Sequence, residues 1–176
     1  LKNMKKQEPP MQVEEIKLTG GTILVDEIDK NLVFNHSWYV MNKGYVMRSG
    51  KTSKGKREHF LLHREIIRPD KNQFIDHING NRLDNRRCNL RIVTKSQNAM
   101  NMKALSTNKS GYKGAYWHES KGKWISDIKV EGKKIHLGAF DTKEEAALAY
   151  NEGAIKYFGE FARLNVVEKA GAADAD

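Results

Sequence analysis

The most informative segment of the chain spans residues 74–101 and reads FIDHINGNRLDNRRCNLRIVTKSQNAMN. It places a carboxylate, Asp76, beside an imidazole, His77, directly after the apolar pair Phe74 and Ile75. Carboxylate and carboxamide oxygens bind hard metal ions, and a neighbouring histidine can take a proton from water. The segment therefore predicts a one-metal phosphodiesterase site. The alternative interpretation is a turn in which Asp76 caps the backbone and His77 lies on the surface.

Two carboxamides further along the segment favour the site over the turn. Asn89 opens a second apolar run at residues 90–93, and Asn98 follows where a helix can begin. The whole pattern resembles the HNH nuclease family, in which a two-stranded hairpin and a helix surround one metal ion. The residues that carry this resemblance are Asp76, His77, Gly80, Asp84, Asn85, Asn89, Leu90, Arg91, Gln97 and Asn98.

The resemblance implies a role for each of four residues. His77 is expected to be the general base that activates water, and Asn89 is expected to brace the loop and orient His77. Asp76 and Asn98 are expected to hold the metal ion. Asn98 stands where the family name has a histidine, and its oxygen favours magnesium or manganese over zinc. The single cysteine, Cys88, also excludes a multi-cysteine zinc site, and no small-molecule cofactor is expected.

Basic residues around this segment form a second group of candidates. His63 and Arg64 also match the family and are expected to support the site or contact a phosphate; the alternative is that they are half-buried polar residues of an amphipathic element. Arg91 is a further candidate for site support. Arginines of the loop are expected to bind the DNA backbone, although Arg86 or Arg87 could merely be solvated. The arginines expected to bind DNA are Arg82, Arg86 and Arg87, and the residues expected only to form turns are Asn79, Asn81 and Asn85.

A second pattern begins after residue 111. Residues 112–118, 123–130 and 133–140 read as three strands separated by short turns. A helix is predicted from Thr142, because Glu145 completes a capping box, and Gly159 is a natural stop. The residues of its expected packing stripe are Ala146, Ala149, Tyr150, Gly153, Ala154 and Tyr157.

Residues 110–165 resemble the DNA-binding domain of plant ethylene-response factors, the Apetala-two type, which lays a three-stranded sheet in the major groove. The resemblance implies that Trp124, Ile128, Leu137 and Phe140 pack on the helix. The plant domains carry arginines on the sheet, whereas this chain has mostly Lys, Tyr and His, which favours phosphate contact over guanine readout. A metal site at His118 and His136 is a minor alternative. The residues of the expected DNA face are Lys113, Tyr116, His118, Lys123, Asp127, Lys129, Lys134 and His136.

The N-terminal part of the chain is less informative. Residues 13–48 consist of short apolar runs and resemble the leader of composite nucleases, with an expected role in scaffolding and DNA contact. Residues 38–41 and 45–47 predict a hairpin around a turn at 42–44. Residues 49–58 predict a basic flexible loop, and periodicity leaves residues 60–67 undecided between strand and helix.

Positive charge is concentrated in the middle of the chain. The net charge is +9, and residues 43–98 carry 14 basic and 5 acidic side chains. Residues 99–140 carry 8 basic and 3 acidic side chains, whereas residues 141–176 are acidic. This distribution is typical of a protein that faces a polyanion; the alternative is a solvated basic surface.

The sequence thus predicts an α+β protein: a ββα-metal nuclease module followed by a three-stranded antiparallel sheet packed on one helix. The expected divisions are a tail at 1–12, the leader and nuclease at 13–101 with its core at 60–101, a linker at 102–111, the DNA-binding domain at 112–165 and a disordered tail at 166–176. The expected function is metal-dependent cleavage of double-stranded DNA by a homing endonuclease of a phage or mobile intron. A DNA-binding protein with an inactive nuclease module and an RNA-directed nuclease are the alternatives.

The remaining expectations concern the setting of the protein. No apolar run approaches a membrane span, so a membrane partner is not expected. We expect an intracellular protein, in the cytoplasm of a bacterial host, that acts as a monomer or weak dimer. Whether it nicks one strand or breaks both stays open.

Overall fold

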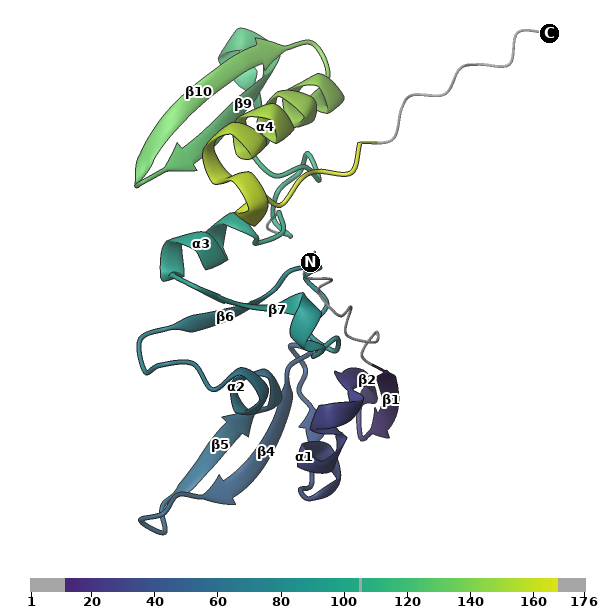
Figure 1. Cartoon of the computed structure of the whole chain (residues 1–176). Coiled ribbons are helices and arrows are strands. Elements are labelled where there is room, and N and C mark those ends of the chain that lie inside the picture. Colours follow the sequence, from purple (N-terminus) through teal and green to yellow (C-terminus); the bar gives the residue numbers. More distant parts are fainter. Residues whose placement is uncertain (1–11, 105, 168–176) are drawn as a thin grey trace, which may run out of the picture. The chain divides into compact units, whose positions relative to one another are not determined.

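The computed structural model describes residues 12–104 and 106–167 (Figure 1). The chain divides into two compact units, with the boundary between Val93 and Thr94. The described residues form a mixed α/β protein with small antiparallel sheets, in agreement with the predicted α+β class. The predicted tails fall outside the described residues, apart from positions 12, 166 and 167.

The first unit begins with the hairpin β1 (Val13–Leu18) and β2 (Gly21–Asp26). Ile16 and Ile23 face each other across this hairpin, and both are buried. Two short helices follow, η1 (Glu27–Asp29) and α1 (Lys30–Phe34). The apolar alternation of the strands therefore supplies one wall of the core of this unit.

A three-stranded sheet comes next, built from β3 (Tyr39–Val40), β4 (Val46–Lys51) and β5 (Arg57–Leu61). The hairpin predicted around residues 42–44 is confirmed, because Gly44 takes a φ of +82° in the turn between β3 and β4. The loop predicted at residues 49–58 is wrong. β4 and β5 pair from Met47↔Leu61 to Lys51↔Arg57, so only residues 52–56 form a turn.

The chain then enters α2 (Leu62–Ile67) and the hairpin of β6 (Phe74–His77) and β7 (Leu90–Val93), with η2 (Arg87–Asn89) just before β7. Residues 60–67 thus contain both a strand end and a helix. Apolar side chains from the leader, the second sheet, α2 and this hairpin meet in one core. Its buried members are Ile16, Ile23, Val25, Val33, Trp38, Val46, Leu62, Ile66, Ile75 and Leu90.

The leader also fixes the loop that joins β6 to β7. Leu24 of β2 donates its N–H to Leu83 O at 2.9 Å and accepts the N–H of Asn85 at 2.8 Å. Asp26 at the end of β2 accepts the N–H of Arg87 at 2.7 Å. The scaffold role expected for residues 13–48 is therefore visible as direct backbone contact with this loop.

The second unit begins with α3 (Lys95–Met100), whose first turn is closed by a capping box between Thr94 and Gln97. The segment predicted as a linker at 102–111 follows within this unit, and its described residues include turns at 106–107 and 109–110. The sheet then runs in the order β10 (Lys133–Phe140), β9 (Lys123–Val130) and β8 (Ala115–His118), with η3 (Glu119–Lys121) between β8 and β9.

One face of this sheet is covered by α4 (Lys143–Phe158), which continues into η4 (Gly159–Phe161) (Figure 1). The predicted capping box of Thr142 and Glu145 is confirmed, as is the stop at Gly159. Gly153 lets the helix approach closely, since a Cβ there would lie 2.8 Å from Leu137 Cδ1.

The packing stripe of α4 differs from the prediction at two positions. Ala147 and Phe158 are buried, whereas Ala149 is half-buried and Tyr157 is 38% exposed. The helix is thus rotated slightly relative to the predicted stripe. The apolar residues that meet across the helix and the sheet are Ile128, Val130, Ile135, Leu137, Tyr150, Ala154 and Phe158.

Candidate active site

Asn89 holds the loop between β6 and β7 closed. Its side-chain Oδ1 accepts the N–H of Asn79 at 3.0 Å, and its Nδ2 donates to Asp84 O at 2.8 Å. Its backbone carbonyl accepts the N–H of Ile78 at 2.9 Å. A buried carboxamide that satisfies backbone groups on both sides of a loop fixes the conformation of that loop. This geometry supports the bracing role expected for Asn89.

His77, at the end of β6, is buried and contacts the carboxamide of Asn85. His77 Nε2 lies 3.4 Å from Asn85 Oδ1, and Asn85 Nδ2 donates to the carbonyls of Arg82 and Leu83 at 3.3 Å. Burial lowers the pKa of His77, which keeps the imidazole neutral at neutral pH. A neutral imidazole is the form that a general base requires.

Asn85 is the contact that sequence reasoning missed. It was expected only to form a turn, yet it is fully buried and is the side chain that contacts the imidazole edge. The sequence signal was its place directly after Asp84 in the matched motif. The contact of Asn85 with His77 was not predictable from spacing, since it depends on how β2 positions residues 83–87.

Asp76 precedes His77 and pairs across the hairpin with Arg91. Both Nε and Nη2 of Arg91 donate to Asp76 Oδ2, at 3.1 and 2.9 Å. The two residues are directly opposed in the register of β6 and β7, and both are largely shielded from solvent. Arg91 therefore fixes the orientation of the Asp76 carboxylate, consistent with the supporting role expected for it.

Two aromatic rings complete the surroundings of His77. The ring centroids of His63 and His77 lie 5.2 Å apart, and Tyr45 lies 5.4 Å from His63 and 6.2 Å from His77. His63 sits on α2 and is 5% exposed, and its Nδ1 is buried with no hydrogen-bond partner within the described part of the chain. Burial, followed by the charges of His77, Arg64 and Arg82, lowers the pKa of His63 to about 3.

The other residue of the expected His-Arg pair serves the fold. Arg64 Nη1 donates to Gln73 O at 3.1 Å, which ties α2 to the segment that leads into β6. Tyr45 was not among the predicted site residues, because a tyrosine next to a turn gives no sign of what it contacts.

The arginines of the loop differ in their freedom to bind a ligand. Arg86 forms a bidentate ion pair with Asp84 at 2.7 and 2.6 Å, and Arg87 forms one with Asp29 at 2.8 and 2.7 Å. These hydrogen bonds raise the pKa of both guanidinium groups and neutralise their charge. Arg82 instead lies 4.3 Å from the centre of the Tyr45 ring and donates to Lys43 O at 2.7 Å. Of the three, only Arg82 has no carboxylate partner among the described residues.

Asn98, the last residue expected at the site, belongs to α3 in the second unit, while Asp76, His77 and Asn89 belong to the first. It is half-buried, and its N–H donates to Thr94 O at 3.0 Å. Within the described residues, no group of three or more His, Cys, Asp or Glu side chains forms a metal site. The expected metal ligands are one carboxylate, from Asp76, and one carboxamide, from Asn98, so they would not form a group of this kind.

The sheet of the second unit carries a polar cluster on the face away from α4. Asp127 Oδ2 accepts the hydroxyl of Tyr116 at 2.7 Å and pairs with Lys134 Nζ at 2.7 Å. Asp127 Oδ1 lies 2.9 Å from His136 Nδ1. Asp127 is 9% exposed, and hydrogen bonds from Lys134, Tyr116 and His136 outweigh its burial and lower its pKa. Three residues of the expected DNA face are thus held together by one carboxylate.

The other residues of the expected DNA face are arranged differently. Lys113 points inside the unit, where its ammonium donates to Met100 O at 2.5 Å and burial lowers its pKa to about 8. Lys123 forms an ion pair with Asp141, and His118 Nδ1 lies 3.3 Å from Ser120 Oγ. Lys129 is exposed. This geometry favours Lys129 over Lys113 as a contact for an external partner.

Known proteins share both parts of this chain. The HNH endonuclease family model matches residues 68–100, which include β6, β7 and α3. An uncharacterised HNH endonuclease of Acanthamoeba polyphaga mimivirus is 31% identical over 152 residues, which cover 84% of this chain and 77% of that protein. The chain belongs to the HNH endonuclease family. The nuclease predicted from the motif is therefore confirmed at the level of the family.

Two further proteins are similar to parts of this HNH endonuclease. Protein 3.8 of Escherichia phage T7 is 33% identical over 112 residues, which cover 63% of this chain and 92% of that protein. An AP2-like ethylene-responsive transcription factor of Arabidopsis thaliana, TOE2, is 41% identical over 58 residues. That match covers 33% of this chain and 12% of the plant protein, in the C-terminal part of the chain.

The described residues contain no helix that is both long and apolar enough to cross a membrane.

Proposed function

We propose that this HNH endonuclease hydrolyses phosphodiester bonds of double-stranded DNA with one divalent metal ion, at a site carried by the β6–β7 hairpin. The observation that carries the proposal is the state of His77. Its imidazole is buried, which lowers its pKa, and it contacts Asn85, while Asp76 is the residue before it on β6.

Asp76 and Asn98 are proposed to hold the metal ion. HNH nucleases generally use one divalent metal, and the donors here are a carboxylate and a carboxamide with no thiolate, since Cys88 is exposed and is the sole cysteine. Such oxygen donors favour magnesium or manganese over zinc. When bound, the ion would stabilise negative charge on the phosphate and on the leaving 3′ oxygen. Arg91 orients the carboxylate for this role through its two hydrogen bonds to Oδ2.

His77 supplies the proton transfer. If Nε2–H donates to Asn85 Oδ1, the neutral ring carries its lone pair on Nδ1, and this nitrogen takes a proton from water. The water oxygen then forms a bond to phosphorus, and the bond from phosphorus to the 3′ oxygen breaks. The leaving 3′ oxygen takes a proton from solvent, so the products are a 5′ phosphate and a 3′ hydroxyl. Asn89 keeps the loop and its Asn85 contact in place throughout.

The second unit is proposed to bind duplex DNA through the sheet face opposite α4. The match to the plant transcription factor supports DNA binding by this part of the chain. The relatives in a phage and a virus support action on DNA inside an infected cell. The proposal includes a role as a homing endonuclease that nicks as a monomer or cuts both strands as a weak dimer.

The test is the conversion of supercoiled plasmid by the wild type with magnesium, with manganese and with EDTA, and by a His77→Ala variant with each metal. We expect conversion only when a divalent metal is present, and a loss of about 10² to 10⁴ in rate in the variant, which is the usual contribution of a general base. His36→Ala is the matched control, because His36 is an exposed histidine of the same unit and lies outside the site. The form of the product distinguishes nicking from a double-strand break.

Other outcomes select the alternatives. Tight duplex binding without cleavage in either metal would favour a DNA-binding protein with an inactive nuclease module. Cleavage of RNA in preference to duplex DNA would favour an RNA-directed nuclease. Full cleavage by His77→Ala would show that His77 is not the base.

A further inference from the structure

The hairpin of β4 and β5 is attached to the first unit along one face. Arg48 reaches from β4 to Glu65 on α2, and Nη2 donates to both carboxylate oxygens at 3.1 Å. The same guanidinium lies 4.2 Å from the centre of the Phe60 ring and 5.4 Å from that of Trp38. Gly50 makes room for it, since a Cβ there would lie 2.7 Å from Arg48 Nη1. These contacts hold the hairpin in a fixed orientation relative to α2.

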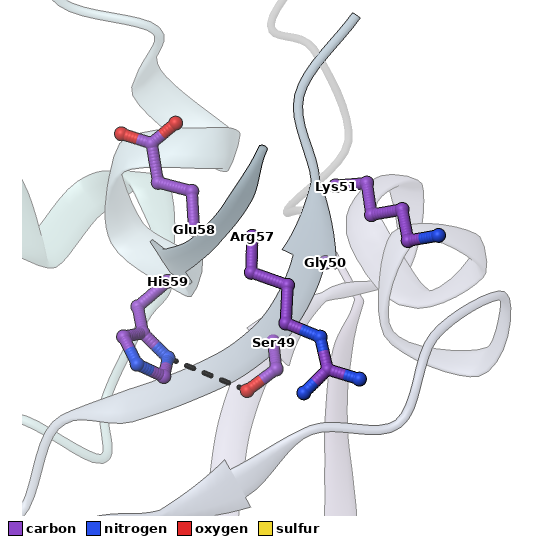
Figure 2. A pocket seen from close by; sticks show the side chains of 6 residues that line it. All are labelled: Ser49, Gly50, Lys51, Arg57, Glu58 and His59. Carbon is purple, nitrogen blue, oxygen red and sulfur yellow. Dashed lines mark hydrogen bonds between the residues drawn. The ribbon is translucent and has the colours of Figure 1, made fainter. Parts of the chain in front are cut away.

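The opposite face of this hairpin is cationic and exposed. Because directly paired residues of antiparallel strands share a face, Ser49 lies beside His59 and Lys51 beside Arg57. We call these four residues the cationic face. They line a hollow of about 530 Å³ together with Gly50 and Glu58, and Ser49 Oγ lies 3.3 Å from His59 Nδ1 (Figure 2). The Glu58 side chain points away from those of Arg57 and Lys51 (Figure 2).

The charges of the cationic face are not balanced within the protein. Over residues 12–104 and 106–167, no ion pair involves Lys51, Arg57 or the turn lysines Lys54 and Lys56. In contrast, Arg86, Arg87 and Arg91 around the candidate site are all paired with carboxylates. Among the described strands of the first unit, the β4–β5 hairpin therefore carries the most cations without a carboxylate partner, namely Lys51 and Arg57.

The hairpin is also shaped for contact with an extended partner. In Figure 1 it runs away from α2, and its turn forms an end of the first unit. Ordered, exposed cations on a rigid two-stranded ribbon fit the phosphates of a nucleic-acid backbone, which carry no base information. A flexible tail of lysines would bind with the same sign of charge but without a fixed register.

We propose that the cationic face binds the phosphate backbone of duplex DNA beside the cleavage site, as a second DNA contact that is independent of sequence. This inference rests on the proposed function, since it assumes that DNA is the substrate. Lys51 and Arg57 each contact one phosphate, and Ser49 and His59 add hydrogen bonds. The contact supplies affinity and takes no part in bond cleavage.

The test is the Lys51→Gln/Arg57→Gln double variant of the full chain. Binding to a fluorescein-labelled duplex of mixed sequence is followed by anisotropy in EDTA, so that cleavage does not interfere, at salt concentrations from about 50 to 200 mM. The slope of log K against log salt should fall in magnitude by about 1.8, because each lost phosphate contact removes about 0.9. The fluorescein-labelled single-stranded RNA of the same sequence is the comparison probe.

A control with the same loss of charge separates a local contact from general electrostatics. Lys17→Gln/Lys71→Gln removes two exposed lysines from the same unit outside the hairpin. This variant should keep the wild-type slope within about 0.3 on the same scale. Equal slopes for the two double variants, or an unchanged slope in Lys51→Gln/Arg57→Gln, would overturn the proposal, as would a loss confined to the RNA probe.

Failure of this inference and failure of the proposed function have different readouts. With magnesium, Lys17→Gln/Lys71→Gln should cleave plasmid as the wild type does, whereas Lys51→Gln/Arg57→Gln should need a higher protein concentration to reach half the maximal rate. If the wild type cleaves no DNA in either metal, the proposed function fails, while the slopes measured in EDTA still decide the role of the hairpin. Both side chains are exposed, so thermal unfolding of the variant should match that of the wild type and exclude a folding defect.

Discussion

At the scale of single residues, His63 and His77 are both buried at the site, but they have different neighbours. His77 has the Asn85 carboxamide at one ring nitrogen and the Asp76 and Asp84 carboxylates nearby, which partly oppose the lowering of its pKa. His63 has no such compensation, since its Nδ1 is buried without a partner among the described residues, and its pKa falls to about 3. A protein that keeps an unpartnered imidazole next to the proposed base is less stable when that imidazole must take up a proton.

His63 should therefore make the fold acid-sensitive. Between its unfolded pKa of 6.5 and its folded pKa of about 3, the unfolded chain binds one more proton than the folded one, so stability falls as pH falls. The limiting contribution is about 1.4 kcal/mol for each pH unit in this window. We expect His63→Gln, which cannot be protonated, to flatten the decline in the free energy of unfolding, measured with urea, as the pH falls below 6.5.

The control for this measurement is His36→Gln, because His36 is exposed and should leave the pH dependence unchanged. His77 contributes a decline of the same sign in all three proteins, so only the difference between them is informative. Equal pH dependence in His63→Gln and the wild type would show that His63 is not buried as a neutral group.

At the scale of elements, features that depend on residues close together in the sequence could be predicted, whereas features that depend on contacts between distant residues could not. The capping box at Thr142 and Glu145 was predictable because its hydrogen bonds join residues three apart. The β4–β5 hairpin was not, because its strands are polar and the contact of Arg48 with Glu65 joins residues 17 positions apart. The Asn85 contact with His77 was hidden for a similar reason, as it depends on β2 pairing with the loop. The carboxylate partners of Arg86 and Arg87 were likewise not visible from spacing.

The capping box makes a prediction about the stability of α4. Thr142→Ala removes the hydroxyl that accepts the N–H of Glu145, whereas the backbone N–H of residue 142 can still donate to the Glu145 carboxylate. A lost cap costs about 1 kcal/mol of protein stability. We expect that decrease in the free energy of urea unfolding of the full chain. Thr107→Ala, at an exposed threonine outside any helix, should change it by less than about 0.5 kcal/mol. A cost for Thr142→Ala no larger than that of Thr107→Ala would contradict the capping role.

At the scale of the whole molecule, charge is divided unequally between the two units. Residues 1–93 carry 18 basic and 11 acidic side chains, whereas residues 94–176 carry 13 basic and 11 acidic side chains. Part of the positive charge on the sheet of the second unit is neutralised within that unit, because Asp127 forms an ion pair with Lys134 and also contacts His136. Non-specific attraction to DNA should therefore come mainly from the first unit, and the sheet should contribute register and a small number of unpaired cations.

Lys129 is the cation of the sheet that best tests this division. It is exposed on β9, on the face opposite α4, and forms no ion pair within the described residues. Lys129→Gln should reduce the magnitude of the salt slope by about 1, the worth of one phosphate contact. In single-turnover cleavage it should raise the protein concentration needed for half the maximal rate and leave the maximal rate unchanged, because His77 lies in the other unit. Lys156→Gln, at an exposed lysine of α4, is the matched control and should behave as the wild type. A lowered maximal rate in Lys129→Gln would mean that the sheet acts in the chemical step as well as in binding.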